Sequence, residues 1–198
     1  MNEPETRAIA GGLELREEAG KRPRLKGYAA VFDSKSVDLG GFIEVVKPGA
    51  FKRALEKGQD VRALVNHNPD LIIGRSGKTG SLTMMEDDRG LLVEIEPPDT
   101  QAGRDVIENV KSGVLDGMSF AFRAVTEKWD TKGKPAFREL LDVDLFDVSV
   151  VAFPAYPKTR VAVRSLEEAL AREAEASREA EAQNRERRLR LHEKTYRL

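Results

Sequence analysis

Short segments in which apolar and polar residues alternate recur along most of the chain, from about residue 7 to residue 163. Gly, Pro, Asp and Asn separate these segments, as is typical where strands end in turns. A strand with one buried face requires such alternation, because successive side chains point to opposite faces of a sheet. The pattern therefore predicts many short strands in an antiparallel barrel or sandwich. The predicted strands span residues 13–17, 24–32, 42–46, 60–67, 81–87, 90–97, 117–130, 136–153 and 160–163.

Two segments have the signals of short helices instead. Residues 48–58 open with Pro48 and close with Gly58, the usual start and stop residues of a helix. Residues 99–113 offer Asp99 or Thr100 as a cap, carry an apolar stripe, and end at a glycine directly before the 117–130 strand. The predicted class is therefore α+β, dominated by strands.

The composition changes at Ser165, after which residues 165–198 contain no Gly or Pro and are rich in Ala, Glu and Arg. Ser165 and Glu168 form a capping-box pattern, which predicts one long helix. Because its apolar positions are mostly alanine, this helix is either a marginal, solvated helix or a segment for interaction or removal. From residue 185 onward it turns basic, which would suit an acidic partner surface. We therefore divide the chain into a domain at residues 1–164 and a charged helical tail at residues 165–198.

Composition excludes several classes of function. The net charge of −1 argues against a protein that binds nucleic acid through bulk charge, so no specific nucleic-acid partner is expected. The chain has no cysteine and only His67 and His192, which excludes disulfides, thiolate metal sites and multi-histidine metal sites. No apolar run approaches the roughly 20 residues that span a bilayer, and the first residues lack a secretory-signal pattern. We expect a soluble, intracellular protein with no membrane partner.

Three residues could together form a nucleophilic site. His67 ends an apolar strand pattern and precedes an Asn-Pro turn, where it is either a half-exposed turn histidine or a base. Ser119, in "GMSFAF", lies on the opposite face from Met118 and Phe120, so it is either a solvated hydroxyl or a nucleophile. A hydroxyl becomes a good nucleophile when a base takes its proton and a third group orients that base.

The third group would be a carboxylate. Asp147, in "LFDVSVVAF", has apolar neighbours on both sides, so its charge needs a partner. That partner is either an Arg or Lys in a salt bridge or an imidazole that the carboxylate orients. Asp142 and Asp144 lie at the more polar end of the same predicted strand and are alternative acids.

Six segments follow one another along the chain: "ETRAIAGGLELRE", "GYAAVFDSKSVDLGGFIEVVKPGAF", "VRALVNHNPDLIIGRSGKTGSL", "DDRGLLVEIEPPDT", "VKSGVLDGMSFAF" and "LFDVSVVAFPAYPKTRVAV". This ordered series resembles the HK97-type prohead proteases of tailed bacteriophages, which are similar in fold to herpesvirus assembly proteases. The resemblance covers about residues 5–164 and implies a closed or partly open antiparallel β-barrel with short flanking helices. It places the family's histidine base on His67 and its nucleophile on Ser119. The family's third member is usually a glutamate before "VS", where this chain has Asp147; an oxyanion loop would fall near Ala155 and Tyr156.

The resemblance also implies a function and its partners. Such proteases self-associate and act inside the assembling prohead in the host cytoplasm, where they cut scaffold or capsid-protein segments and also themselves. No cofactor or metal is expected, and the tail at 165–198 would be a self-cleaved or scaffold-binding segment. The alternative is a non-enzymatic capsid assembly or scaffold protein on the same fold.

Overall fold

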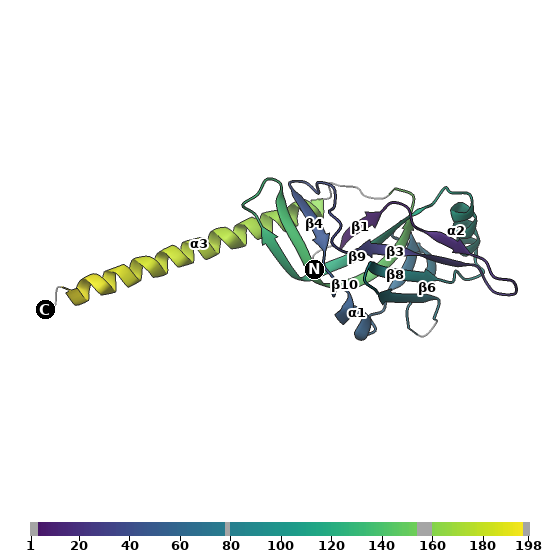
Figure 1. Cartoon of the computed structure of the whole chain (residues 1–198), viewed down its shortest axis with the longest axis horizontal. Helices are drawn as coiled ribbons and strands as arrows, with labels where there is room; N and C mark the ends of the chain where they lie inside the picture. The colour runs from purple at the N-terminus through teal and green to yellow at the C-terminus, as the bar shows by residue number, and fades with distance from the viewer. Residues whose placement is uncertain (1–3, 78–79, 154–159, 196–198) are drawn as a thin grey trace.

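The computed structural model describes residues 4–77, 80–153 and 160–195. This part of the chain is a mixed α+β fold made mainly of strands, from which one long helix projects (Figure 1). The strands are β1 (Glu5–Ile9), β2 (Glu14–Arg16), β3 (Arg24–Val31), β4 (Phe42–Val46), β5 (Arg62–Val65), β6 (Asn68–Arg75), β7 (Leu82–Glu86), β8 (Gly90–Ile95), β9 (Gly117–Asp130) and β10 (Ala136–Val151). The helices are α1 (Lys52–Glu56), α2 (Gln101–Lys111) and α3 (Arg160–Thr195).

The strands form two sheets. The larger sheet has the order β1-β9-β10-β5-β6, with β4 also paired to β10, and the smaller sheet has the order β2-β3-β8-β7. The long strand β10 pairs with β9 antiparallel but with β4 and β5 in parallel. The expectation of an antiparallel barrel is therefore corrected: within the described residues the sheets are not closed into a barrel, and the larger sheet is mixed. Alternation along a strand reports its buried face, not the direction of its neighbours.

Most of the predicted elements are present, with one predicted strand replaced by a helix and two strands that were not predicted. The predicted strand at 160–163 is the beginning of α3, although its valines favour a strand. Two strands, β1 and β6, were not expected. Both carry charged or exposed residues at positions where a regular alternation would place apolar ones.

The core lies between the two sheets and contains the buried face of β9. Phe120 packs edge-on against Phe51, which precedes α1, with ring centroids 5.3 Å apart, and tilted against Phe122 at 5.0 Å. Met118 is part of the same apolar cluster. Because rings of this size bury much apolar surface, they hold β9 firmly between its neighbours. The first part of β9, which carries Ser119, is thus buried, whereas its second part is exposed or half-buried.

A cluster of buried charges joins four strands of the larger sheet. The guanidinium of Arg138 on β10 is only 1% exposed and lies 2.7 Å from Glu5 on β1, 2.9 Å from Glu44 on β4 and 2.6 Å from Glu127 on β9. Arg7 on β1 lies 2.7 Å from both Glu5 and Glu44. Burial raises the pKa of Glu5, but its bonds to Arg138 and Arg7 outweigh this effect and leave that pKa below its ordinary value. Glu5 therefore remains ionised, and the cluster ties β1, β4, β9 and β10 together.

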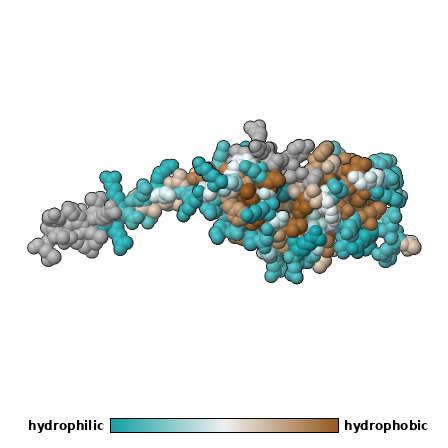
Figure 2. All heavy atoms as spheres, turned by 45° about the horizontal axis from the view of Figure 1, so that its top comes forward, coloured by the Kyte–Doolittle hydropathy of each residue, from teal (hydrophilic) through white to brown (hydrophobic). Residues whose placement is uncertain are grey.

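Helix α3 is anchored to the body only by its first turns in the described part of the chain. Leu166 packs against a small cluster formed by Phe42, Trp129 and other apolar residues, and Arg172 lies 2.8 Å from Glu127. With 36 residues the helix is about 54 Å long, so most of it extends away from the sheets (Figure 1). Its visible coloured part is mainly teal and pale in Figure 2, whereas brown, apolar atoms gather on the body.

No helix in the ranges that the structure describes is long and apolar enough to cross a membrane.

Replacing Arg138 with methionine should destabilise the protein strongly. The Arg138→Met variant leaves three carboxylates without their shared cation, and breaking a buried ion pair on one side costs about 3–5 kcal/mol. Urea unfolding followed by circular dichroism measures the change. The matched control is Arg16→Met, because Arg16 is exposed and 3.6 Å from Glu14, where less than about 1 kcal/mol is expected. Equal stability of Arg138→Met and the wild type would contradict this role of the cluster.

Candidate active site

His67 lies at the tip of the tight hairpin between β5 and β6. Val65 pairs with Asn68, so only Asn66 and His67 form the turn. Both have positive φ angles, 52° and 55°, as in the type I′ turns that connect two-residue hairpins. The turn thus comes two residues earlier than the expected Asn-Pro turn, since Asn68 and the proline after it already belong to β6.

The position of His67 in this turn is strained. A positive φ brings the Cβ of an L-residue close to its own backbone and costs about 1–2 kcal/mol relative to glycine. Asn-Gly is the preferred pair for such a turn, but here a histidine occupies the second position. A strained residue that persists at such a position indicates a functional demand on its side chain.

Three hydrogen bonds hold the hairpin tip against β10. The backbone N–H of Asn66 donates to the carbonyl of Val150 at 2.9 Å, and the N–H of Ala152 donates to Oδ1 of Asn66 at 3.1 Å. The backbone N–H of His67 donates to Oγ of Ser149 at 3.2 Å. These contacts offset the strain of the turn and place the imidazole over the sheet.

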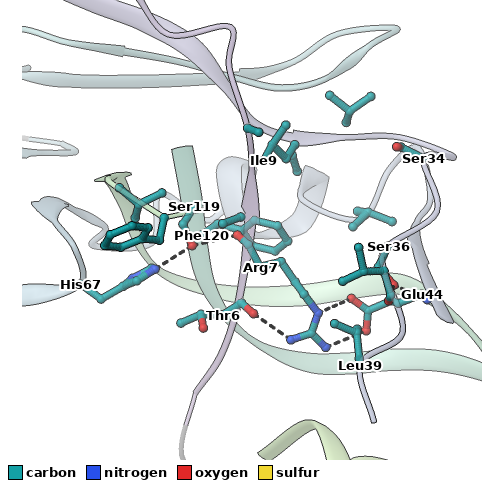
Figure 3. Close-up of a pocket in the computed structure, with 18 of the residues that line it drawn as sticks. Thr6, Arg7, Ile9, Ser34, Ser36, Leu39, Glu44, His67, Ser119 and Phe120 are labelled. Atoms are coloured by element: carbon teal, nitrogen blue, oxygen red, sulfur yellow. Dashed lines mark hydrogen bonds and ion pairs between the residues drawn. The ribbon is translucent and has the colours of Figure 1, made fainter. Parts of the chain in front are cut away.

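Ser119 is on β9, directly opposite Ser149 on β10 and Ala8 on β1. Its side chain is 2% exposed, so it is not a solvated hydroxyl. Its Oγ lies 2.6 Å from Nε2 of His67 and 2.9 Å from the carbonyl oxygen of Arg7 (Figure 3). The hydroxyl therefore has two acceptors for its single proton.

Asp147 is the carboxylate that meets the imidazole. Its Oδ1 lies 2.7 Å from Nδ1 of His67 and accepts from Oγ of Ser149 at 2.8 Å. A register shift between Leu145 and Asp147 interrupts the pairing of β10 with β9. Bulges of this kind redirect side chains.

The two alternative acids have another partner. Asp142 and Asp144 each lie 2.7 Å from Arg53 of α1. The hydrogen bond from Arg53 holds the pKa of Asp144 below its ordinary value. Of the three acids considered from the sequence, the structure brings only Asp147 to His67.

The chemistry of the two partners assigns the direction of the hydrogen bonds through the imidazole. An ionised carboxylate can only accept, so Nδ1 carries the proton that faces Asp147. Nε2 then has a lone pair directed at the hydroxyl of Ser119. The resulting chain, from carboxylate through imidazole to hydroxyl, is the arrangement that activates a serine.

A cavity of about 740 Å³ opens beside Ser119. Figure 3 draws residues that line it, with His67 and Ser119 toward the left, Arg7 near the centre and Glu44 toward the right. Val37 and Phe153 also line it and are 54% and 73% exposed, so the cavity is accessible from solvent. The rest of its lining comes from Thr6, Ala8, Ile9, Ala10, Ala30, Val31, Ser34, Lys35, Ser36, Leu39, Val46, Asn66, Phe120, Val151 and Ala152.

Sequence reasoning missed two contributors to this site. The Arg7 carbonyl belongs to β1, whose place beside Ser119 depends on pairing over more than a hundred residues. Ser149 stands in the "VS" of the quoted segment, but its contacts depend on the hairpin tip. The expected oxyanion residues Ala155 and Tyr156 lie outside the described residues, and so does the side chain of His192. Among the described residues, no group of three or more His, Cys, Asp or Glu could hold a metal ion.

Comparisons with known proteins found one matching family and a solved structure of similar fold. A family model described as "Caudovirus prohead serine protease" matches residues 12–172. The structure is similar to that of the bacteriophage T4 capsid assembly protease, gp21, with a TM-score of 0.56 and 11% sequence identity. That match covers 77% of this chain and 98% of the T4 chain. No curated protein sequence matches the chain.

The strain at His67 predicts an unusual order of stability between two variants. Both His67→Gly and His67→Ala lose the imidazole, but only alanine must adopt a positive φ with a Cβ. We expect His67→Gly to be more stable by about 1 kcal/mol in urea unfolding. The same pair of substitutions at Lys57, where φ is −73°, is the control and should favour alanine. If His67→Ala is the more stable of the two, the turn does not strain this residue.

Proposed function

The chain belongs to the caudovirus prohead serine protease family, and from this premise we propose that it is a serine endopeptidase of phage capsid maturation. The observation that carries the proposal is the hydrogen-bonded chain Asp147–His67–Ser119, with contacts of 2.7 Å and 2.6 Å. Ser119 is the nucleophile, His67 is the general base, and Asp147 orients His67.

The reaction begins when a peptide carbonyl enters the cavity beside Ser119. Nε2 of His67 takes the hydroxyl proton while Oγ bonds to the carbonyl carbon, which forms a tetrahedral intermediate. The Nδ1–H bond to Asp147 stabilises the imidazolium that results. The C–N bond then breaks, the leaving amine takes the proton from Nε2, and an acyl-enzyme remains.

Water completes the cycle by the same route. His67 takes a proton from water as it attacks the acyl carbon, and returns that proton to Oγ of Ser119 when the ester bond breaks. The products are a new amino terminus and a new carboxyl terminus, with the enzyme unchanged. Backbone donors to the oxyanion are each worth about 3–4 kcal/mol in known acyl-transfer enzymes.

The carbonyl of Arg7 affects the first proton transfer, from Ser119 to His67. Because it also accepts from Oγ of Ser119, at 2.9 Å, it competes with Nε2 for the hydroxyl proton. In the reactive state the proton points to His67, whose neutral imidazole is the stronger base. When the proton turns to His67, the hydrogen bond to the Arg7 carbonyl is lost, so this carbonyl holds Oγ only before the reaction starts.

The proposed substrates are segments of the scaffold or the capsid protein, together with this chain itself. The protein would act inside the assembling prohead, in contact with the major capsid protein and with other copies of itself. The cavity beside Ser119 is bordered mainly by small and apolar side chains, which suits an extended peptide.

Co-expression with the capsid protein tests the activity and its nucleophile. Replacing Ser119 with alanine should abolish cleavage of the capsid protein and of the chain itself, a fall of about 10⁴-fold or more. Intact-protein mass spectrometry of assembled proheads measures both products. Ser112→Ala is the control, because Ser112 is an exposed serine at the end of α2. This variant should cleave the capsid protein and itself as the wild type does. Equal cleavage by Ser119→Ala would refute the nucleophile, and absence of cleavage by the wild type would favour a non-enzymatic assembly protein.

A matched pair of substitutions tests which acid orients the histidine. In Asp147→Asn the amide can donate to Nδ1 and so favours the wrong tautomer, which should lower the cleavage rate by about 10⁴-fold. Asp144→Asn weakens the pairing with Arg53 and should change the rate by no more than about threefold. Cleavage time courses in the same proheads compare the two variants. A larger loss in Asp144→Asn than in Asp147→Asn would reverse the assignment.

A further inference from the structure

Ser149 lies where the hairpin tip, the carboxylate and the imidazole meet. It is fully buried, at 0% exposure, and stands directly opposite Ser119 across the β9–β10 pair. Asp147 is two residues earlier on β10, and residues two apart in a strand share a face. One face of two adjacent strands therefore carries both serines and the carboxylate, with His67 above them.

The Ser149 hydroxyl both donates and accepts a hydrogen bond within this site. It donates to Oδ1 of Asp147 at 2.8 Å and accepts from the backbone N–H of His67 at 3.2 Å. Its oxygen also lies 3.3 Å from Nδ1 of His67, so it borders the bond between the imidazole and the carboxylate. One hydroxyl thus contacts both groups of the pair that activates Ser119.

We propose that Ser149 is a positioning residue of the protease site, which fixes the Asp147 carboxylate and the His67 imidazole relative to each other. This inference rests on the proposed function of Ser119, His67 and Asp147.

Two physical demands at the site explain why a hydroxyl is needed. The carboxylate of Asp147 can rotate about its side-chain bonds, and a donor on the same strand holds Oδ1 toward Nδ1. The backbone of His67 has a positive φ, and its N–H needs a buried acceptor to keep the turn in that conformation. Serine satisfies both demands because its hydroxyl donates and accepts at once. An alanine satisfies neither, so it leaves the buried N–H of His67 without its acceptor and Asp147 without this donor.

The test compares the full-length wild type with Ser149→Ala and Ser149→Thr. Because the chain has only two histidines, ¹⁵N labelling of histidine resolves the two imidazoles by NMR. The wild type should show His67 protonated at Nδ1, with that proton protected from exchange. In Ser149→Ala the tautomers should mix and the proton exchange faster. Ser149→Thr keeps the hydroxyl and should restore the wild-type signal.

A second measurement follows the reactivity of Ser119 with a fluorophosphonate probe, which forms an Oγ–P bond and releases fluoride. Ser149→Ala should react about ten to a hundred times more slowly than the wild type, because small misplacements of reacting groups cost factors of this size. Ser149→Thr should react at nearly the wild-type rate. Ser119→Ala gives the background.

Ser76→Ala is the matched control for a purely structural hydroxyl. Ser76 also bonds the backbone on both sides, accepting from Val61 N–H and donating to the Gln59 carbonyl, both at 2.9 Å. The Ser76→Ala variant should be less stable in urea unfolding, but its His67 NMR signal and its rate of labelling by the fluorophosphonate probe should match the wild type.

The outcomes separate the inference from the proposed function. An unchanged His67 signal and labelling rate in Ser149→Ala would overturn the positioning role while leaving Ser119 as the nucleophile. Absence of probe labelling in the wild type would count against the proposed function, and the NMR comparison would still decide whether Ser149 fixes the imidazole. Loss of the signal in Ser149→Ala, with recovery in Ser149→Thr, supports the role.

Discussion

The burial of one guanidinium among three carboxylates holds the site's scaffold together. Arg138 contacts Glu5, Glu44 and Glu127, which come from three other strands and are as much as 133 residues away along the chain. A charge in the interior is tolerated only when its hydrogen bonds are satisfied, so these strands can approach only with their carboxylates in place. The strand β1, which the cluster secures at its Glu5 end, is the one whose Arg7 carbonyl reaches Ser119. The strand β1 therefore contacts both the ion cluster and Ser119.

The site combines this rigid sheet with a strained turn. Ser119 and Asp147 lie on paired strands whose other face is packed with aromatic and aliphatic side chains, so neither can move far. His67 comes from a hairpin tip that would more easily hold a glycine. The contacts of Asn66 and Ser149 with this tip offset that strain, so the imidazole becomes as well fixed as the groups on the sheet.

The sequence predicted the elements of this fold better than their arrangement. The strand at 117–130 was predicted with its observed bounds, because its alternation is long and ends in clear turn residues. The parallel pairing of β10 with β4 and β5 could not be predicted, since alternation is the same in either direction. The strand β1 escaped notice because its charged residues are buried through Arg138 and Glu44, partners that only the folded chain brings near.

The residues of the site could also be predicted only in part from the sequence. His67, Ser119 and Asp147 were expected from their residue types, their order and a family resemblance, and the structure brings the three together, with their catalytic roles still a proposal. Ser149 and the Arg7 carbonyl were not expected, because their part depends on a turn conformation and on a backbone atom.

Contacts of the folded chain also cross residue 164, where the sequence predicts the division between the domain and the tail. Leu166 packs against Phe42 and Trp129, and Arg172 shares Glu127 with Arg138. A chain that ended at residue 164 would expose this apolar cluster and leave Glu127 with one cation, whereas a chain that ended after Glu173 would keep both contacts.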